Sequence, residues 1–553
     1  MSQTNLVYNV QDKPAWGKTM IFALQQLLAI LAATIAVPAI VGHGMSPSAA
    51  LFGAGAGTLV YLLFTKFKSP VFLGSSFSFL SSMGVAFAGA ATMATGYLGL
   101  IIGAVLAGLV YVALSFVVKF AGTKWIDKIM PAVVIGPTVA IIGLSLAGNA
   151  VGDLFKGNFL ELQYSFDPAT GNVVENMVSR ANWMVCLLCG MVTLFTTIII
   201  SVFGKKTLKM IPFVIGIAAG YVTASIFTGI GYACGGSHDG WKIIDFGKFA
   251  SIEWYPNFSF LQMFTQGKIQ FSGGYFLTIL VAYVPVAFVV FAEHIADHKN
   301  LSTIIGNNLL EDPGLNRTLL GDGIGSMAGA FFGGCPNTTY GESIGAVAIS
   351  GNASIRTIFV TALMAIVLSF IGPFATFLSS IPPCVMGGVC IALYGFIAVS
   401  GLKMVQKVDL NDNRNLFVVS VILIAGVGGL SLTFFKGTNY AITITEVACA
   451  LVLGIIVNLI VNIGKKKEEP AAELAEAPAE EAAPEEEPAE QPEEAPVKEP
   501  AEEEAAPEEN AEEEQPAEES EPEAEPEAEE PAEDAEPEEA PEEEKPEENP
   551  EEK

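Results

Sequence analysis

Charged side chains, histidine and cysteine are scarce over most of this chain. Residues 1–467 hold 25 Lys and Arg and 18 Asp and Glu, and the whole chain has four histidines and seven cysteines. The net charge of −31 arises in residues 468–553, which contain 41 acidic residues and three lysines. The acidic average therefore says nothing about the partners of the first 467 residues, and no stretch there predicts binding to nucleic acid.

The C-terminal segment lacks the apolar residues that a core requires. Residues 465–553 are mainly Glu, Ala and Pro after three lysines. Such a segment cannot offset its ordering entropy, and its repeated prolines interrupt any helix. We expect a disordered acidic cytoplasmic tail whose deletion leaves activity nearly intact. A basic cytoplasmic partner for the tail is the alternative, and its identity is open.

The few cysteines and histidines do not form a recognisable metal motif. Cys186 and Cys189 are spaced as CxxC, but they lie in the apolar stretch WMVCLLCGMVTLF, with no second pair nearby. His294 and His298 are four apart, yet Glu293 precedes both, unlike the glutamate of an HExxH zinc motif. We therefore expect buried thiols that behave as small apolar side chains, no metal, and no cofactor.

Long uncharged runs dominate what is present. Fourteen apolar stretches are long enough, some marginally, to cross a bilayer. Helices satisfy their own backbone hydrogen bonds in lipid, so the pattern predicts an all-α membrane bundle. The predicted segments are 19–41, 48–65, 71–87, 93–117, 131–147, 182–203, 211–230, 273–296, 317–333, 337–350, 354–378, 384–400, 415–432 and 441–463.

The distribution of basic residues predicts the orientation. With an even number of spans and a cytoplasmic N-terminus, 19 Lys and Arg fall on the inside and 6 on the outside. This bias follows the positive-inside rule and predicts that both termini are cytoplasmic. The expected parts are a cytoplasmic N-terminus (1–18), a first repeat of seven segments (19–230), an extracellular loop (231–272), a second repeat (273–464) and the tail (465–553).

Two of the fourteen segments are too polar for ordinary membrane helices. The third contains SPVFLGSSFSFLSS and the tenth contains CPNTTYGESIG, each with a proline, a Gly/Ser/Thr-rich stretch and a short apolar run. They hold matching positions in two sets of seven, which is typical of inverted repeats whose broken segments meet at a transport site. The alternative is that the glycines only permit close helix packing.

Ionisable residues mark one place in the second half. Glu293 and Asp297 share a helix face at the end of VAYVPVAFVVFAEHIADH, with His294 and His298 on a neighbouring face, while Glu342 lies within the tenth segment. Two carboxylates in a low-dielectric cavity cannot both be ionised cheaply, which suits a carrier that binds and releases a proton. Carboxylates and free backbone N–H groups complement a neutral heterocycle, and Phe77 offers both a flat apolar contact and a backbone N–H.

The motifs GSSFSF, VPVAFVVFAEHIADH, LLEDPGLNRTLLGDGIGS, FFGGCPNTTYGESIG and IPPCVMGGVCIALYG occur in this order. With them the chain resembles the nucleobase–ascorbate transporter family over residues 15–464, and most closely its bacterial uracil-transporting members. The resemblance implies proton-coupled uracil import across the cytoplasmic membrane and a homodimer. It also implies fourteen segments, with a core domain (segments 1–4 and 8–11) that slides against a gate domain (segments 5–7 and 12–14).

The resemblance also implies roles for individual residues. Glu293 and Glu342 would bind the nucleobase, and Glu293, Asp297, His298 and Asp322 are the candidates for proton coupling. Backbone N–H groups of Phe77 and Gly341, the ring of Tyr340 and the side chain of Tyr394 would complete the binding site.

Three positions depart from the family pattern. Asp297 stands where uracil carriers often have histidine, Ser343 where the family usually has asparagine, and Ser350 where it tends to have threonine. Glu342 favours uracil, because purine carriers tend to have glutamine there. A carrier of a purine such as xanthine or urate remains the alternative, followed by an anion channel or exchanger, which Glu342 disfavours. A receptor is disfavoured because the tail shows no output domain.

Overall fold

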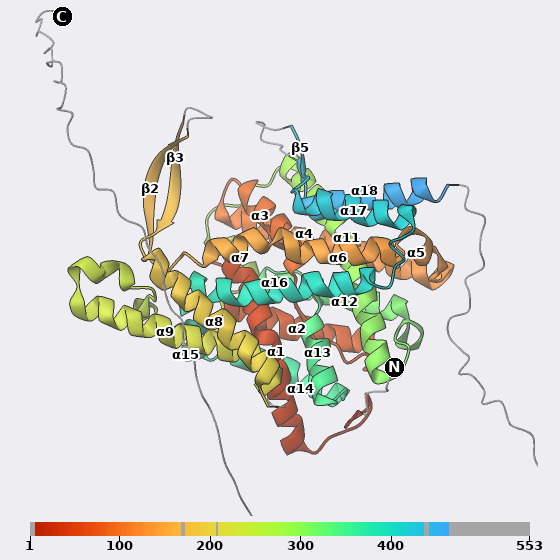
Figure 1. Ribbon diagram of the computed structural model, residues 1–553, viewed down its shortest axis with the longest axis horizontal. Coiled ribbons are helices and arrows are strands. Elements are labelled where there is room, and N and C mark those ends of the chain that lie inside the picture. Colours follow the sequence, from red (N-terminus) through yellow and green to blue (C-terminus); the bar gives the residue numbers. More distant parts are fainter. Residues whose placement is uncertain (1–5, 168–171, 206–207, 436–441, 464–553) are drawn as a thin grey trace, which may run out of the picture. The chain divides into compact units, whose positions relative to one another are not determined.

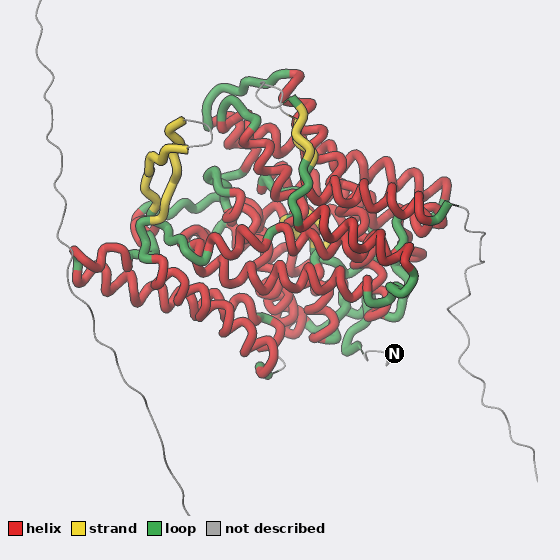
Figure 2. Tube along the Cα trace, turned by 45° about the horizontal axis from the view of Figure 1, so that its top comes forward, coloured by secondary structure: helices red, strands yellow, loops and turns green. Residues whose placement is uncertain are grey.

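The computed structural model describes residues 6–167, 172–205, 208–435 and 442–463, and these lie within one compact unit, Met1–Lys467. The predicted acidic tail lies outside the described residues. Helices make up most of this part, as Figures 1 and 2 show.

The first half contains α1 (Trp16–Val41), α2 (Pro47–Phe64), β1 (Leu73–Ser75), η1 (Phe77–Phe79), α3 (Leu80–Ala88), α4 (Met93–Ala121), α5 (Lys124–Ile129), α6 (Ala132–Ser145), α7 (Ala147–Asp153), β2 (Leu160–Asp167), β3 (Asn172–Ser179), α8 (Trp183–Phe203), η2 (Leu208–Met210) and α9 (Pro212–Cys234). The second half contains η3 (Gly236–Trp241), η4 (Phe246–Ala250), α10 (Ser259–Thr265), α11 (Gly273–Ile305), η5 (Leu310–Gly314), α12 (Leu315–Gly333), β4 (Asn337–Thr339), α13 (Gly341–Ser350), α14 (Ile355–Ser369), α15 (Gly372–Ser380), α16 (Pro383–Val405), α17 (Asn413–Val427), β5 (Leu432–Phe434), β6 (Ile442–Ile444) and α18 (Glu446–Val461).

Most predicted segments contain one long helix or a short strand followed by a helix, and one of them contains two helices. Among the described residues, eight helices are long and apolar enough to cross a membrane by length and composition, or nine if one bent pair forms a single span. That pair is α14 and α15, which meet at an angle of 85° within the predicted segment 354–378. Pro373 lies in the first turn of α15, where its missing N–H is tolerated, so the chain begins a new helix there.

The two broken segments meet through their strands. β1 pairs with β4 in antiparallel register, Leu73 opposite Thr339 and Ser75 opposite Asn337. Each strand leads into a half-helix, η1 and α3 after β1 and α13 after β4. This pairing confirms the extended stretches expected in the two segments. Two other hairpins, β2–β3 and β5–β6, lie near the edge of the helical body in Figure 2 and were not predicted.

The helices pack in two groups. α2 lies along α12 and α14, and α4 packs on α11 and α12; in the second group α16 packs on α6 and α8, α8 on α9, and α17 on α18 (Figure 1). Gly53 and Gly57 on α2 face Gly329 and Gly325 on α12, where a Cβ would meet backbone carbonyl groups. Small residues thus let the two backbones approach closely, as in other membrane bundles.

The N-terminal residues hold the far end of α13. Val7 and Tyr8 donate backbone hydrogen bonds to the carbonyl of Gly351, and Ala353 donates to the carbonyl of Tyr8. The Ser354 hydroxyl donates to the carbonyl of Asp12 at 2.6 Å. The half-helix α13 is therefore anchored at its C-terminal end, while its N-terminal end meets β4.

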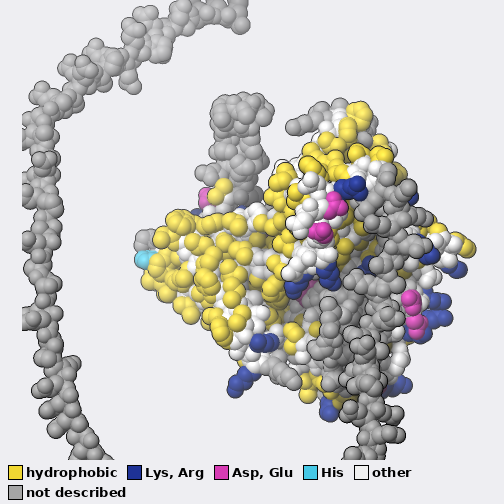
Figure 3. Space-filling view, turned by 45° about the vertical axis from the view of Figure 1, so that its right-hand side comes forward, with side chains coloured by type: hydrophobic (Ala, Val, Ile, Leu, Met, Phe, Trp, Pro, Cys, Tyr) yellow, Lys and Arg dark blue, Asp and Glu magenta, His cyan; other side chains and the backbone are white. Residues whose placement is uncertain are grey.

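Apolar side chains cover much of the outer surface. In Figure 3 hydrophobic residues form a broad continuous area, and most Lys and Arg gather toward the lower and right-hand margins. On α8 alone, Phe195, Ile199 and Phe203 expose 56%, 54% and 80% of their surface. Water would penalise so large an exposed apolar area, and lipid would not. This surface agrees with a multi-pass membrane protein.

Candidate functional site

The long helix α11 carries four ionisable side chains on two neighbouring faces. Ser272 caps its first turn by accepting a hydrogen bond from the backbone N–H of Tyr275. Near its middle, Glu293 and Asp297 are half-buried, whereas His294 and His298 are completely buried. The i, i+4 spacing therefore separates a carboxylate face, open to solvent or ligand, from a closed histidine face.

On the carboxylate face, each broken segment contacts one acid. Ser78, in η1, donates its hydroxyl to Glu293 Oε2 at 3.1 Å. Thr339, in β4, donates its hydroxyl to Asp297 Oδ2 at 2.6 Å. A carboxylate has room for further donors beyond these single bonds. The face therefore keeps acceptor capacity for a ligand.

Glu342 lies in the first turn of α13 and is half-buried. The helix α13, which begins with Gly341 and Glu342, packs on α11. Gly341 is exposed, and a Cβ added there would meet open space. Glu342 and the Gly341 backbone therefore lie at the start of a helix that packs on the helix of Glu293, and their role in binding stays a prediction.

Both half-helices begin without a side-chain cap. Ser76 before η1 and Tyr340 before α13 make no capping hydrogen bond, a feature that they share with other helices of the described residues such as α1, α6 and α16. The first N–H groups of a helix have no intrahelical partner and favour a polar or anionic acceptor. The backbone N–H groups of Phe77 and Gly341 stand at these helix starts, where a ligand acceptor is favoured.

Aromatic side chains border the carboxylates. The ring of Phe77 packs edge-on against Tyr394 of α16, with 5.4 Å between ring centroids. Tyr340 is buried, and its hydroxyl donates to the carbonyl of Ser75 at 2.8 Å across the β1–β4 pair. Phe77 and Tyr394 thus lie where the two groups of helices meet, whereas the Tyr340 hydroxyl ties the two broken segments together.

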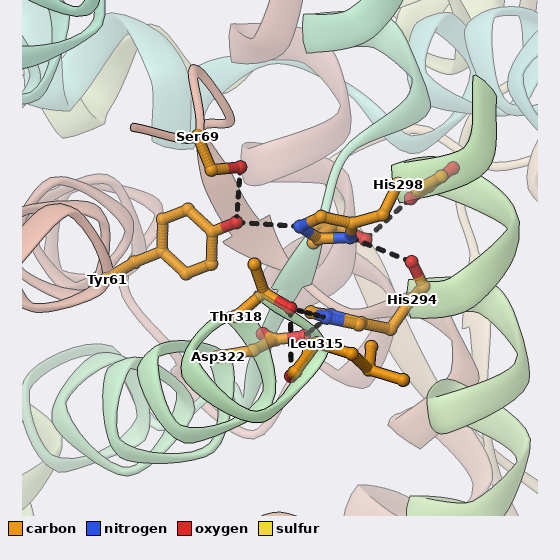
Figure 4. Close-up of polar contacts among 9 residues, drawn as sticks. Tyr61, Ser69, His294, His298, Leu315, Thr318 and Asp322 are labelled. Atoms are coloured by element: carbon orange, nitrogen blue, oxygen red, sulfur yellow. Dashed lines mark hydrogen bonds and ion pairs between the residues drawn. The ribbon is translucent and has the colours of Figure 1, made fainter. Parts of the chain in front are cut away.

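On the histidine face, every ring nitrogen has a partner, as Figure 4 shows. His294 Nδ1 lies 2.7 Å from Asp322 Oδ2, and its Nε2 lies 3.0 Å from the Thr318 hydroxyl. His298 Nε2 lies 2.7 Å from the Tyr61 hydroxyl, which in turn contacts Ser69 at 2.7 Å. Asp322 and His298, both predicted for proton coupling, therefore belong to this closed network behind the carboxylate face.

Ser343, a departure from the family pattern, is completely buried. Its hydroxyl oxygen accepts hydrogen bonds from Gln26 Nε2 at 2.6 Å and from the backbone N–H of Phe72 at 3.2 Å. The side chain therefore ties α13 to α1 and to the start of the other broken segment. Ser350, the other departure in α13, donates to the carbonyl of Ala346 at 2.7 Å.

Several contacts of the site were missed from the sequence. Ser78, Thr339, Thr318 and Tyr61 each bond an ionisable side chain of α11 or α12. The Ser/Thr-rich character of the two broken segments was a signal for Ser78 and Thr339. Nothing in the local sequence around Tyr61 or Thr318 indicated a distant histidine as partner.

Other possible sites lie elsewhere or are not found. A cavity of about 600 Å³ is lined by Ile35, Ser46, Asp153, Lys156, Glu253 and Met386, among others, but by neither Glu293 nor Glu342. Across the described ranges, no three His, Cys, Asp or Glu residues are arranged to hold a metal ion. That no cofactor is required stays a prediction.

Comparison with known proteins identifies related sequences. The model of the Permease family matches residues 17–435. The uracil permease of Bacillus caldolyticus is 38% identical over 453 residues, 82% of this chain and 94% of that protein. Those of Bacillus subtilis (strain 168) and Escherichia coli (strain K12) are 37% and 34% identical over 460 and 459 residues, which are 83% and 82% of this chain and 95% of each relative.

Two solved structures share the fold. The transmembrane domain of the cyanobacterial bicarbonate transporter BicA aligns with a TM-score of 0.50 at 15% identity, over 83% of this chain and all of that one. The murine anion transporter Slc26a9 in its inward-facing state aligns with a TM-score of 0.55 at 13% identity, over 82% of this chain and 69% of that one. At these identities the likeness concerns the arrangement of helices alone.

Proposed function

This chain belongs to the Permease family, that of the nucleobase–ascorbate transporters, and we propose that it imports uracil together with protons across the cytoplasmic membrane. Relatives named uracil permease, 34–38% identical over most of their length, support the substrate. The family and these relatives also make it a transporter and not an enzyme.

One observation carries the proposal: the β1–β4 pair joins two uncapped half-helices beside the carboxylates of α11. Uracil is a flat neutral ring with two N–H donors and two carbonyl acceptors. Glu293 and Glu342 would accept its N–H groups, and the backbone N–H groups of Phe77 and Gly341 would donate to its carbonyls. The faces of Tyr340, Phe77 and Tyr394 supply the apolar surroundings that such a ring needs.

Proton coupling would use the same carboxylates. Asp297 lies one helical turn from Glu293, and α13, which carries Glu342, packs on the same helix. Closely spaced carboxylates favour uptake of a proton. A proton bound on entry would neutralise part of the cluster while uracil is carried. Asp297 stands one turn from Glu293 and is half-buried. It is therefore better placed than the closed-in His298 to exchange that proton.

The two groups of helices suggest how access alternates. We propose fourteen segments in two inverted repeats, with α1–α4 and α11–α15 as the core and the remaining spans as the gate. The binding site would then move together with the core, and Tyr394 would face the site from the gate. Both termini would be cytoplasmic, and two copies would pair as a homodimer.

Uptake of radiolabelled uracil into proteoliposomes tests the proposal. Uptake should saturate, should require an inward proton gradient, and should be inhibited by excess unlabelled uracil or thymine more than by xanthine or urate. Inhibition by xanthine but not by uracil would replace the substrate with a purine. Saturable uptake that does not depend on a proton gradient would contradict proton coupling but would leave uracil as the substrate.

A further inference from the structure

A small cavity lined by buried residues lies beside Asp322. It has a volume of about 10 Å³, and its lining includes Asp322, Tyr111, Ser326 and Asn337. Asp322 and Tyr111 expose 1% and 4% of their surface, so bulk solvent does not reach them. The hydroxyl of Tyr111 and Oδ1 of Asp322 have no hydrogen-bond partner in the described part of the chain. Two orphaned polar atoms therefore border one void.

Asp322 pairs with His294 on the side away from the cavity. The hydrogen bonds of His294 determine how many protons this pair holds. The Thr318 hydroxyl donates to the carbonyl of Leu315 at 3.1 Å, so it can accept a bond from His294 Nε2–H (Figure 4). One proton then lies between His294 Nδ1 and Asp322 Oδ2, which are 2.7 Å apart. Wherever that proton resides, the pair has no net charge.

We propose that this cavity binds one water molecule, which bridges Asp322 Oδ1 and the Tyr111 hydroxyl. A cavity of this volume is close to the ~10–15 Å³ that one water needs, and a buried water requires two to four polar partners. The water donates to Asp322 Oδ1 and exchanges a hydrogen bond with the Tyr111 hydroxyl, and Ser326 is available as a third partner. Both orphaned atoms are thereby satisfied.

The proton count favours water over a cation. A metal ion at Oδ1 would require an ionised Asp322, and the proton would then reside on His294. Two positive charges would face one carboxylate in a closed interior, which is unfavourable at low dielectric. A neutral ligand avoids this conflict. Tyr111 is then a positioning residue that acts through the water on the Asp322–His294 pair behind the carboxylate face.

Radiolytic hydroxyl-radical labelling of the full-length protein in detergent tests for the water. Radicals formed from a bound water modify the adjacent side chain even when bulk solvent cannot reach it. Tyr111 should be labelled. Tyr275 is the internal control, because it is equally buried at 4% exposure and its hydroxyl already donates to the carbonyl of Ala86 at 2.7 Å. Absence of label on both tyrosines would overturn the proposal.

A double-mutant cycle gives a second, independent measurement. Tyr111→Phe and Ser326→Ala should each lower the melting temperature by about 1–2 °C. If they share the water, the double variant should lose clearly less than the sum of the two. Tyr275→Phe combined with Ser326→Ala should be additive. Additivity in both pairs would contradict a shared ligand.

A high-resolution structure of the same preparation distinguishes water from an ion. One density peak within hydrogen-bond distance of Oδ1 and the Tyr111 hydroxyl is expected. Five or six oxygen contacts at metal-ligand distances would replace water by a cation and overturn the choice of ligand. None of these measurements uses transport, so their failure would leave the uracil proposal standing.

Discussion

On one face of α11, Glu293 and Asp297 are half-buried, and each accepts one hydrogen bond from a broken segment. One residue further along, His294 and His298 are completely buried and bonded at both ring nitrogens. The sequence presents four titratable groups within six residues, and it is their environment that separates them. Unfilled acceptor capacity indicates ligand binding, and full satisfaction indicates a structural network.

The largest expected effect is a loss of uracil uptake when a carboxylate of the carboxylate face is neutralised. Glu293→Gln keeps the size and the bond from Ser78 but removes the charge that would accept a uracil N–H. A hydrogen bond to a charged group contributes about 1.5–3 kcal/mol, so uracil uptake should fall roughly tenfold to a hundredfold. The exposed Glu311→Gln is the matched control and should transport normally. Normal uptake by Glu293→Gln would remove Glu293 from the site.

The next largest effect is a loss of stability when a buried histidine of the histidine face is removed. His294→Ala leaves Asp322 Oδ2 buried without its partner, at a cost of about 1–3 kcal/mol in the free energy of unfolding. The melting temperature of the purified protein should drop by about 1–3 °C, whereas Asn300→Ala, exposed on the same helix, should leave it unchanged. Lost uptake with an unchanged melting temperature would make His294 a transport residue instead.

A smaller effect sharpens the account of the buried pair. Asp322→Asn can donate an amide N–H to His294 Nδ1 and keep an oxygen toward the small cavity. It should therefore stay within about 1 kcal/mol of the parent in stability, and Asp322→Leu should lose more. The two variants are compared by thermal unfolding. Equal losses would mean that the negative charge of Asp322 is required for stability.

The smallest effect concerns Ser343. Ser343→Ala removes one acceptor shared by Gln26 and Phe72, worth about 1 kcal/mol, so uptake should decline a few-fold at most. Since the side chain is buried away from the exposed Gly341 and the half-exposed Glu342, preference for uracil over xanthine should not change. Competition assays check this. A switch in preference toward xanthine would show that Ser343 takes part in substrate recognition.

Local patterns made much of this fold predictable. Uncharged runs located the helices, and matching proline and glycine-rich breaks identified the two half-helices that pair through β1 and β4. Contacts between distant segments were not predictable. The i, i+4 pattern shows which residues share a helix face, but it does not show which neighbouring helix that face packs against. The bend before Pro373 and the β2–β3 hairpin were missed for a similar reason, since apolar composition alone does not report where a helix stops.

The sequence by itself determined a helical membrane transporter with two broken segments and a carboxylate cluster, because bilayer length, helical period and the cost of buried charge are properties of the local chain. Only the tertiary structure decided which ionisable side chains keep free hydrogen-bonding capacity and which have their hydrogen bonds completed by neighbours. Ser78 and Thr339 leave Glu293 and Asp297 acceptor capacity, while Thr318, Tyr61 and Asp322 complete the bonding of His294 and His298. Hydrogen-bond satisfaction depends on partners that are distant in the chain, such as Tyr61 for His298 and Ser78 for Glu293, and packing alone brings them together.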